Sequence, residues 1–474
     1  MVFPLRPTAV VQIALAMVAL ATVALAETPY VLPEPRGFPP EGPNIPADNP
    51  LTWERVELGR FLFYDKRLSG NQTFACASCH EQALGFTDGR ARAIGSTGEL
   101  HPRSSMSLVN IAFAGTLAWA NNLLFALEEQ ALIPMFGEHP IELGLVGREQ
   151  ELFARLRADT RYQRLFAEAY PGATDPVTLD TITKALASFE RTLISGNTPY
   201  ERYAYGIDDN AISAAAKRGE FLFFKDPNVE CFHCHGGFNF TSSVDHMGSV
   251  AERTFHNNGL YNLRCADFGL PDLILLQCNT TPPAERCDGR GPQAMGCYPP
   301  DNTGLYDVSH THADMGRFKA PSLRNITVTA PYMHDGSIAT LPDVIEHYAA
   351  GGRTISDGEF AGVGSDSPLI GQFIRGFTLT QRQKDDLLAF LESLTDDDFL
   401  TNPRFADPFA PVACPGDCDL DGSVAINELV AGVGISLETS TLGVCVVSDV
   451  SGDGAVTVDE IIRATLGALG ECSS

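Results

Sequence analysis

Two short cysteine and histidine motifs are the residues of this sequence best suited to chemistry. A Cys-x-x-Cys-His sequence occurs twice in the 474-residue chain, at residues 76–80 and 231–235. This motif attaches c-type haem: both thiols bond to the haem, and the following histidine can ligate the iron. A lone Cys-x-x-Cys could be a redox dithiol or half of a zinc site, but here the histidine follows both times. We therefore predict two covalently bound haem c groups, on Cys76, Cys79, Cys231 and Cys234, with His80 and His235 as proximal ligands.

The sixth ligand of each iron decides what the haem can do. A six-coordinate haem transfers electrons, whereas an open position can bind peroxide or oxygen. The sequence holds eleven histidines and eight methionines, besides its tyrosines, so the residue types alone leave this ligand open.

Two acidic loops near the C-terminus have the spacing of calcium ligands. The first fits D-x-D-x-D-G-x5-E, and the second, 32 residues later, fits the same frame with serine at position three. Calcium takes six to eight oxygen ligands, and the glycine permits the sharp turn. The predicted ligands are Asp417, Asp419, Asp421, Ser423 and Glu428 in the first loop, and Asp449, Ser451, Asp453 and Glu460 in the second. Each loop leads into a helical segment, which predicts an EF-hand-like or dockerin-like calcium module over residues 414–474. Dockerin loops usually end with aspartate, so the glutamates favour a self-contained module; a merely acidic tail is the alternative.

The N-terminus predicts export. Arg6 precedes an apolar run that ends at Ala24-Leu25-Ala26, which is typical of a signal peptide over residues 1–26; an uncleaved membrane anchor is the alternative. An exported, periplasmic protein can form disulfides. Eight cysteines remain after haem attachment: Cys265, Cys278, Cys287 and Cys297 in an insertion, and Cys414, Cys418, Cys445 and Cys472 in the tail. Each group of four can close two disulfides, with three pairings open.

The elements that position these groups are mainly helices. Similar apolar segments, 58–64 and 218–224, precede the two haem motifs and indicate two related domains. Apolar residues at helical spacing also predict helices over 149–170, 179–193 and 385–394, while strand-like alternation is scarce. We predict a mainly α fold, with two cytochrome c-like haem domains in tandem and a small α-helical module. The predicted boundaries are 27–50 (a Pro-rich leader that forms no helix), 51–205, 206–400, 401–413 (a linker) and 414–474.

The charge of the chain excludes two classes of partner. The net charge of −26 argues against nucleic acid, because phosphate binding needs a basic face, and against docking on anionic lipid. No second apolar stretch matches the length of the N-terminal one, so no membrane contact is expected after signal cleavage.

Ten stretches of the sequence are similar to those of a known family. The chain from about Asn49 to Pro408 resembles the bacterial di-haem cytochrome c peroxidase/MauG family, and within it the MbnH-like di-haem enzymes. The matching stretches are residues 58–80, 86–90, 94–98, 101–103, 127–130, 139–144, 231–240, 316–325, 329–337 and 346–352.

The resemblance implies roles for single residues. The haem on His80 would react with peroxide, with Glu142 moving protons beside it and Trp119 relaying electrons between the haems. Tyr348 matches the distal ligand of the haem on His235, a position that is methionine in ordinary cytochrome c peroxidases and tyrosine in MauG-like enzymes. Met333 is the main alternative ligand.

Two departures from ordinary cytochrome c peroxidases accompany these matches. Thr329 and Pro331 match carbonyl ligands of an inter-haem calcium ion, but the family's asparagine ligand is Ser104 here. Serine can still offer an oxygen. The histidine that caps the resting peroxidatic haem in ordinary peroxidases falls near Ser96, which predicts an open site, although His101 lies close in sequence. His310 and His312 form a His-x-His in a polar loop, where solvated histidines are commoner than a metal site.

Three functions follow from these predictions. The first is an exported enzyme that uses hydrogen peroxide to oxidise a side chain, such as tryptophan, of a partner protein through high-valent haem and long-range electron transfer. The second is a cytochrome c peroxidase that reduces peroxide with electrons from a small cytochrome. The third is a non-enzymatic di-haem electron carrier, which would hold two six-coordinate haems.

Overall fold

The computed structural model describes residues 28–262, 299, 302–358, 360–410, 414–419, 423–450 and 455–471. These residues are mainly helical, as predicted, with one antiparallel pair of short strands, β1 (Thr354–Ile355) and β2 (Gly362–Val363). Among the described helices, none has the length and apolar character that crossing a membrane requires. The predicted signal peptide and Cys265, Cys278, Cys287 and Cys297 lie outside the described residues.

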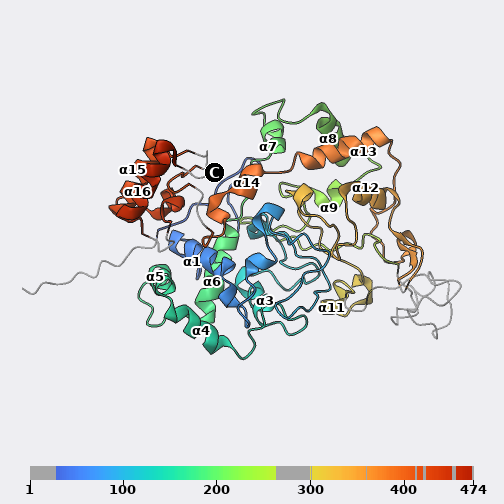
Figure 1. Cartoon of the computed structure of the whole chain (residues 1–474). Helices are drawn as coiled ribbons and strands as arrows, with labels where there is room; N and C mark the ends of the chain where they lie inside the picture. The colour runs from blue at the N-terminus through green and yellow to red at the C-terminus, as the bar shows by residue number, and fades with distance from the viewer. Residues whose placement is uncertain are drawn as a thin grey trace, which may run out of the picture.

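Helices make up most of the regular structure, and α15 and α16 lie together in the tail (Figure 1). In chain order they are α1 (Trp53–Tyr64), α2 (Leu127–Gln130), α3 (Leu132–Phe136), α4 (Glu149–Ala158), α5 (Thr160–Ala169), α6 (Leu179–Arg191), α7 (Pro199–Ala204), α8 (Ala214–Lys225), α9 (Phe232–His235), α11 (Tyr306–Ser309), α12 (Leu341–Ala349), α13 (Gln381–Glu392), α14 (Asp397–Thr401), α15 (Ile426–Ser436) and α16 (Val458–Leu466).

The two repeated apolar segments form equivalent helix pairs. In the first half of the chain α1 packs along α6, and in the second half α8 packs along α13. A Cβ atom at Gly59 of α1 would lie 1.9 Å from the carbonyl oxygen of Ala185, and one at Gly219 of α8 would lie 2.0 Å from that of Asp386. The same glycine of the repeated segment therefore permits a close helix crossing in both halves.

The helical stretch predicted over residues 149–170 is divided in two. Asp159 has an extended backbone conformation and caps α5, where its carboxylate accepts a hydrogen bond of 2.8 Å from the backbone N–H of Arg161. The same carboxylate lies 2.8 Å from Arg67 Nη1. An N-cap aspartate with this tertiary ion pair ends α4 and begins α5, although the apolar spacing continues across it.

The proline-rich leader forms no helix in its described part, residues 28–50, and packs against both halves of the molecule. Phe38 is buried between Phe113 of the first half and Phe238 of the second, and the Arg324 guanidinium lies 4.8 Å from the centre of its ring. The leader therefore fills a space between the two haem-bearing halves.

The chain returns to the first half after α13. Phe399 and Phe405 are buried in the same hydrophobic core as α1 and α6, and Tyr64 donates a hydrogen bond of 2.6 Å to the carbonyl of Phe405. The predicted linker therefore packs against the first half at Phe405, near the start of its described part, residues 401–410.

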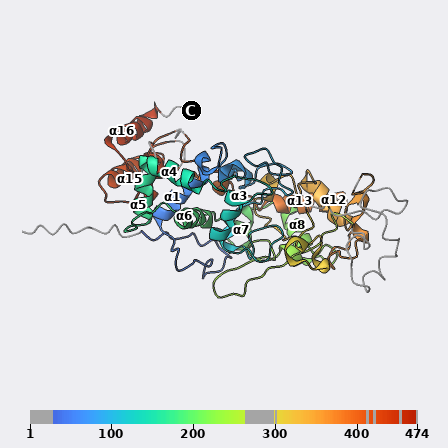
Figure 2. The same ribbon diagram turned by 90° about the horizontal axis from the view of Figure 1, so that it is seen from below.

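The tail module lies at one end of the molecule, against the start of α1, with α12 and α13 toward the other end (Figures 1 and 2). A Cβ atom at Gly443 would lie 2.7 Å from the Trp53 ring, and Arg404 Nη2 donates a hydrogen bond of 3.3 Å to the Gly443 carbonyl. Helices α15 and α16 follow the two acidic loops, as the sequence predicts.

Candidate active site

The first haem motif is held by a short turn and a backbone carbonyl. Cys76–Ser78 form a 3-10 turn, and His80 Nδ1 lies 2.8 Å from the carbonyl oxygen of Phe86. The left-handed conformation of Phe86, with φ of 59°, turns this carbonyl toward the histidine. An imidazole that donates its Nδ1–H in this way leaves Nε2 free for a metal.

The second motif repeats this arrangement. Within α9, His235 Nδ1 lies 3.1 Å from the carbonyl of Pro321 and 3.3 Å from that of Phe240, which again has positive φ. Burial lowers the pKa of His80, and it lowers that of His235 to about 4. Both rings are therefore neutral, as an imidazole ligand must be.

The cysteines of the two motifs carry no disulfide. They are Cys76, Cys79, Cys231 and Cys234. By contrast, Cys418 and Cys445 of the tail form a disulfide, and Cys414 is also disulfide-bonded. Within the described chain, the thiols left free are those that haem attachment needs.

Glu142 lies beside the first motif, held there by its backbone. Its carbonyl accepts a hydrogen bond of 2.7 Å from the Ser96 N–H. A Cβ atom at Gly95 would lie 1.8 Å from the carbonyl oxygen of Ile141, so a glycine is needed where the two segments cross. Burial raises the pKa of the Cys79 thiol to about 12, with a further contribution from the Glu142 carboxylate. The Glu142 carboxylate therefore lies close enough to the first motif to influence the ionisation of Cys79.

Burial also raises the pKa of the Glu142 carboxyl group, to about 7. A carboxyl group with a pKa near neutrality can both accept and return a proton, which is the requirement for general acid–base work. Two residues of the segment 93–101 lie next to Glu142. Ser96 contacts its backbone carbonyl, and the His101 Nε2 atom is 4.0 Å from Glu142 Oε1.

A cavity of about 240 Å³ extends from the second motif. Its walls include Cys231, Cys234, His235, Tyr348 and Met333. The two residues predicted as alternative distal ligands therefore face one space. Asn258 lies between them: its Nδ2 is 3.3 Å from Met333 Sδ, and its side chain opposes the rise that burial causes in the Tyr348 pKa.

Trp119 lines the same cavity and connects the two halves of the molecule. Its Nε1–H donates a hydrogen bond of 2.9 Å to the carbonyl of Ser104, and its own carbonyl accepts one of 2.7 Å from the Lys319 N–H. The indole is thereby fixed between a segment of the first half and one of the second.

Two buried polar groups in this region suit an anionic ligand. Lys319 is buried, its Nζ donates to the Thr116 carbonyl at 3.0 Å, and burial lowers its pKa to about 7. His334 is stacked on Phe318 at 3.5 Å, and its buried Nε2 has no hydrogen-bond partner among the described residues. The carboxylates of haem propionates would satisfy such groups, so the residues present fit the haem that the cysteine motif predicts.

The three residues predicted to hold an inter-haem calcium ion all line this cavity. They are Ser104, Thr329 and Pro331. The Ser104 hydroxyl donates to the carbonyl of Met333 at 3.2 Å, which leaves its lone pairs available. The inter-haem calcium site stays a prediction.

A model of the di-haem cytochrome c peroxidase family matches residues 53–209. The methylamine utilization protein MauG of Methylorubrum extorquens is 33% identical over 355 residues, which cover 75% of this chain and 82% of that protein. The chain belongs to the di-haem cytochrome c peroxidase family.

Other members of the di-haem peroxidase family support the same placement. The cytochrome-c peroxidase IdrP1 of Denitromonas iodatirespirans is 34% identical, with 79% of this chain and 92% of that protein covered. The crystal structure of a MauG-like protein associated with microbial copper homeostasis is 42% identical, with a TM-score of 0.72, and covers 80% of this chain and 100% of its own. The protein is therefore an oxidoreductase of the peroxidase class, and two haem c groups are the cofactors of its family.

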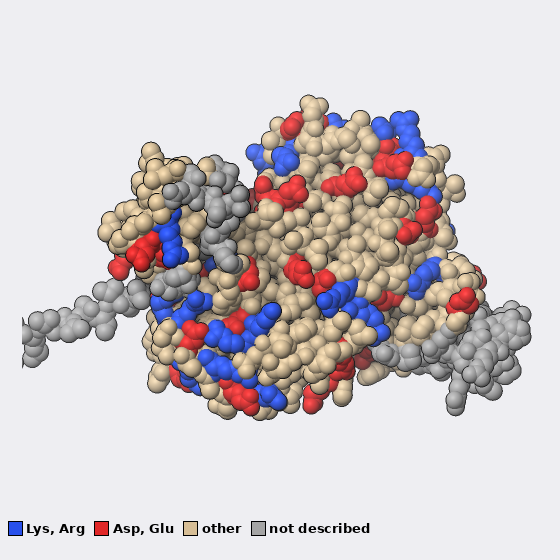
Figure 3. Space-filling view, viewed as in Figure 1, with Lys and Arg blue, Asp and Glu red and all other residues tan. Residues whose placement is uncertain are grey.

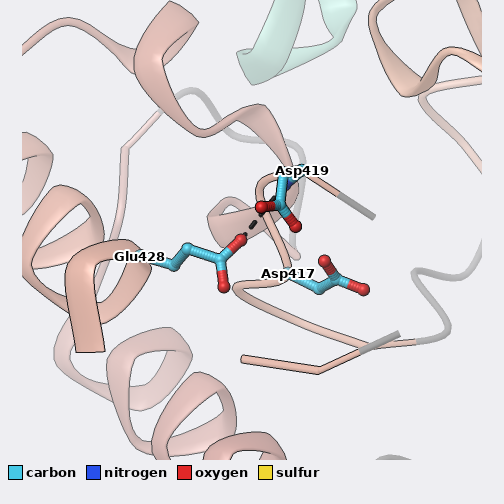
Figure 4. Close-up of side chains that lie close together, drawn as sticks. All are labelled: Asp417, Asp419 and Glu428. Atoms are coloured by element: carbon cyan, nitrogen blue, oxygen red, sulfur yellow. Dashed lines mark hydrogen bonds between the residues drawn. The ribbon is translucent and has the colours of Figure 1, made fainter. Parts of the chain in front are cut away.

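In the tail, three of the predicted calcium ligands converge. Carboxylate oxygens of Asp417, Asp419 and Glu428 lie within 4.8 Å of one another (Figure 4). Glu428 also accepts hydrogen bonds from the Asp419 N–H at 3.1 Å and the Ala425 N–H at 2.7 Å. Clustered carboxylates are the donors that calcium prefers, so this part of the loop fits the ion.

The remaining tail predictions are described in part. Ser423 is exposed, and Asp449 and Glu460 are buried in the second loop. Asp421, Ser451, Asp453 and Cys472 lie outside the described residues. The Cys418–Cys445 disulfide was one of the pairings left open by the sequence, and it ties the first loop to the segment before the second.

Sequence reasoning did not single out three residues of the site. Lys319 and His334 lie inside stretches that match the family, so position in those stretches was a usable signal. Asn258 lies in an Asn-Asn-Gly sequence typical of a turn, and no sequence pattern links it to Tyr348 or Met333. His310 is exposed and ends α11, and no metal cluster that includes it is found among the described residues.

Proposed function

We propose that this protein is an exported di-haem peroxidase of the MauG/MbnH type, which uses hydrogen peroxide to oxidise a side chain of a partner protein. The observation that carries the proposal is Tyr348 on the wall of the second-haem cavity, with Trp119 on the same cavity. The similarity to MauG and to a MauG-like crystal structure supports it. Tryptophan is the proposed target side chain.

The two haems supply the iron chemistry, and the chain supplies ligands and a proton acceptor. His80 and His235 would hold the irons through Nε2, because their Nδ1 atoms contact backbone carbonyls. Glu142, with a carboxyl pKa near neutrality, would accept a proton from peroxide and return it to the oxygen that leaves. Trp119, fixed between the halves, provides an aromatic relay for electrons.

Tyr348 would be the second protein residue to hold the iron on His235, since both line the same cavity. A phenolate ligand stabilises oxidised iron better than a thioether does, and a second haem that stores an oxidising equivalent needs this property. Calcium is proposed at two places: between the haems, on Ser104, Thr329 and Pro331, and in the tail loops.

The proposed location is the periplasm, after removal of residues 1–26. The Cys418–Cys445 disulfide supports an oxidising compartment. On the face shown in Figure 3, basic and acidic side chains are interspersed over the described residues. A mixed surface of this kind, with a net charge of −26, suits a protein partner rather than nucleic acid.

Cytochrome c peroxidase activity is the second candidate. Two observations favour it: relatives with that name reach 34% identity, and Met333 lines the cavity beside Tyr348. A thioether ligand would suit a haem that accepts electrons from a small cytochrome.

Electron paramagnetic resonance of the ferric protein, followed by peroxide addition, tests the proposal. We expect one high-spin haem and one low-spin haem, and a peroxide-induced change in the optical spectrum that Tyr348→Phe alters and Met333→Leu leaves unchanged. Rapid turnover of peroxide with a reduced donor cytochrome, and a spectrum that depends on Met333 instead, would favour the second candidate. Two six-coordinate haems whose spectra do not change with peroxide would indicate a non-enzymatic electron carrier.

A further inference from the structure

His101 lies beside Glu142, and the proposed function gives it no role. His101 Nε2 lies 4.0 Å from Glu142 Oε1, and the two side chains are 28% and 29% exposed. Histidine and glutamate come from separate segments of the chain, on either side of Trp119. Their approach is therefore a feature of the tertiary structure.

The backbone fixes the distance between these segments. The Ser96 N–H donates to the Glu142 carbonyl at 2.7 Å, and Glu99 Oε2 accepts a hydrogen bond of 3.0 Å from the Ile141 N–H. The His101 N–H donates to the Ala93 carbonyl at 2.8 Å. Two of these hydrogen bonds join the segments, and the third holds His101 within its own segment. The backbone therefore places the imidazole on the side of the carboxylate.

The tautomer of His101 follows from its contacts with Arg103. Its Nδ1 lies 3.0 Å from the backbone nitrogen of Arg103 and 3.2 Å from the backbone oxygen of the same residue. That oxygen already accepts a hydrogen bond from the Ala93 N–H, whereas the Arg103 N–H has Nδ1 as its acceptor. The Arg103 N–H has no other acceptor among the described residues, so Nδ1 accepts. In a neutral ring the hydrogen must then be on Nε2, which faces Glu142.

The pair is not an ion pair. An ion pair would raise the pKa of the histidine, but burial and the Arg103 charge lower the pKa of His101 to about 4. Burial raises the pKa of Glu142 to about 7. A neutral imidazole N–H therefore faces a carboxyl group that changes its protonation near neutral pH.

We propose that His101 is a positioning residue: rotation of the partly exposed side chains closes the 4.0 Å between Nε2 and Glu142 Oε1, so that the Nε2–H donates a hydrogen bond to the ionised carboxylate and leaves Oε2 to exchange protons with peroxide. The proposal rests on the acid–base role of Glu142 in the proposed function. The hydrogen bond fixes the orientation of the carboxylate and favours its ionised form, which is the form that accepts a proton.

Cyanide binding to the ferric holoprotein provides a test that needs no turnover. Hydrogen cyanide binds ferric haem as the anion, so its proton must pass to a base beside the iron. The pH midpoint of the association rate then reports the ionisation of Glu142. We expect His101→Leu to move this midpoint upward by about one pH unit and to slow association about tenfold, because a hydrogen bond to the carboxylate is lost.

His101→Gln is the conservative variant. Its side-chain amide can supply an N–H, so we expect the midpoint to return toward that of the wild type. His246→Leu is the matched control and should leave the profile unchanged. This histidine lies in the second half, where its ring contacts Phe238 and its Nδ1 hydrogen-bonds the Met247 carbonyl. Haem absorbance of each variant checks loading and folding.

Distinct results would overturn this inference or the proposed function beneath it. If His101→Leu keeps the wild-type profile, or if His101→Gln is as defective as His101→Leu, the imidazole N–H has no positioning role. If Glu142→Gln also keeps the wild-type profile, Glu142 is not the base, and the proposed function fails at that point. A normal His101→Leu profile with an altered Glu142→Gln profile contradicts the His101 inference alone.

Discussion

At the scale of single residues, the candidate site depends on burial more than on charge pairing. Burial raises the pKa of Glu142 to about 7 and lowers that of Lys319 to about 7. Groups with such pKa values are expected where protons move or where an anionic cofactor is bound. Both residues lie beside the predicted haem positions.

The pH dependence of the peroxide reaction follows from Glu142. As a base it must be ionised, so the rate should fall as the pH drops below about 7, through the pKa of this group. Glu142→Gln should lower the rate by about 10²-fold or more and remove that dependence. Stopped-flow mixing with peroxide between pH 5 and 9 measures both effects. A Gln variant that keeps the wild-type profile would exclude Glu142 as the base.

At the scale of elements, the repeated segment serves the same purpose in both halves. Gly59 lets α1 approach α6, and Gly219 lets α8 approach α13. Each haem motif follows its helix within a short loop, so the crossing helps to set where the cysteines lie.

Substitution of either glycine should separate its helix pair. Gly59→Ala or Gly219→Ala would place a methyl group about 2 Å from a backbone carbonyl, so we expect a loss of about 1–3 kcal/mol in the free energy of unfolding. Gly434→Ala in α15, where the nearest atom is the Ser440 hydroxyl at 3.0 Å, is the control and should cost less. Thermal or denaturant unfolding of the holoprotein measures the difference, and equal costs at all three sites would contradict the crossing argument.

The first tail loop is the element where calcium is easiest to test. Glu428→Gln removes one of three converging carboxylates, so we expect calcium affinity to fall about tenfold or more. Glu438→Gln, an exposed carboxylate outside both loops, should leave affinity unchanged. Isothermal titration with calcium after chelation makes the comparison, and equal affinities would mean that the cluster binds no ion.

At the scale of the whole molecule, segments distant in sequence hold the parts together. The leader places Phe38 between the two halves, and the segment after α13 buries Phe399 and Phe405 in the first core. The tail rests on Trp53 through Gly443. The described parts of the leader and of the tail therefore contact the body that carries the two motifs.

Gly443→Val should detach the tail from the first half. Its side chain would occupy the space of the Trp53 ring, so the tail contact should be lost while the haem spectra stay unchanged. Limited proteolysis should then cut the chain between residues 405 and 414 faster than in the wild type. Thr439→Val, at an exposed residue of the tail, is the control. Unchanged proteolysis of Gly443→Val would show that the tail does not depend on this contact.

Local chemistry explains how much the sequence alone determined. Each haem motif is contained in five consecutive residues, and each calcium loop in twelve, because these groups are bound by neighbours in the chain. Helices with repeated apolar spacing were predicted for the same reason. The division of residues 149–170 at Asp159 was not, since the ion pair that reinforces this cap comes from Arg67, far away in sequence.

Only the tertiary structure decided what surrounds the two motifs. The approach of His101 to Glu142, the position of Asn258 between Tyr348 and Met333, and the burial of Lys319 each depend on segments separated by tens of residues or more. Sequence fixes which groups are present, but distance and burial set their pKa values and their partners. The sequence therefore determines the residues that would bind haem and calcium within each motif. The fold determines the burial and the neighbours that would make these groups reactive.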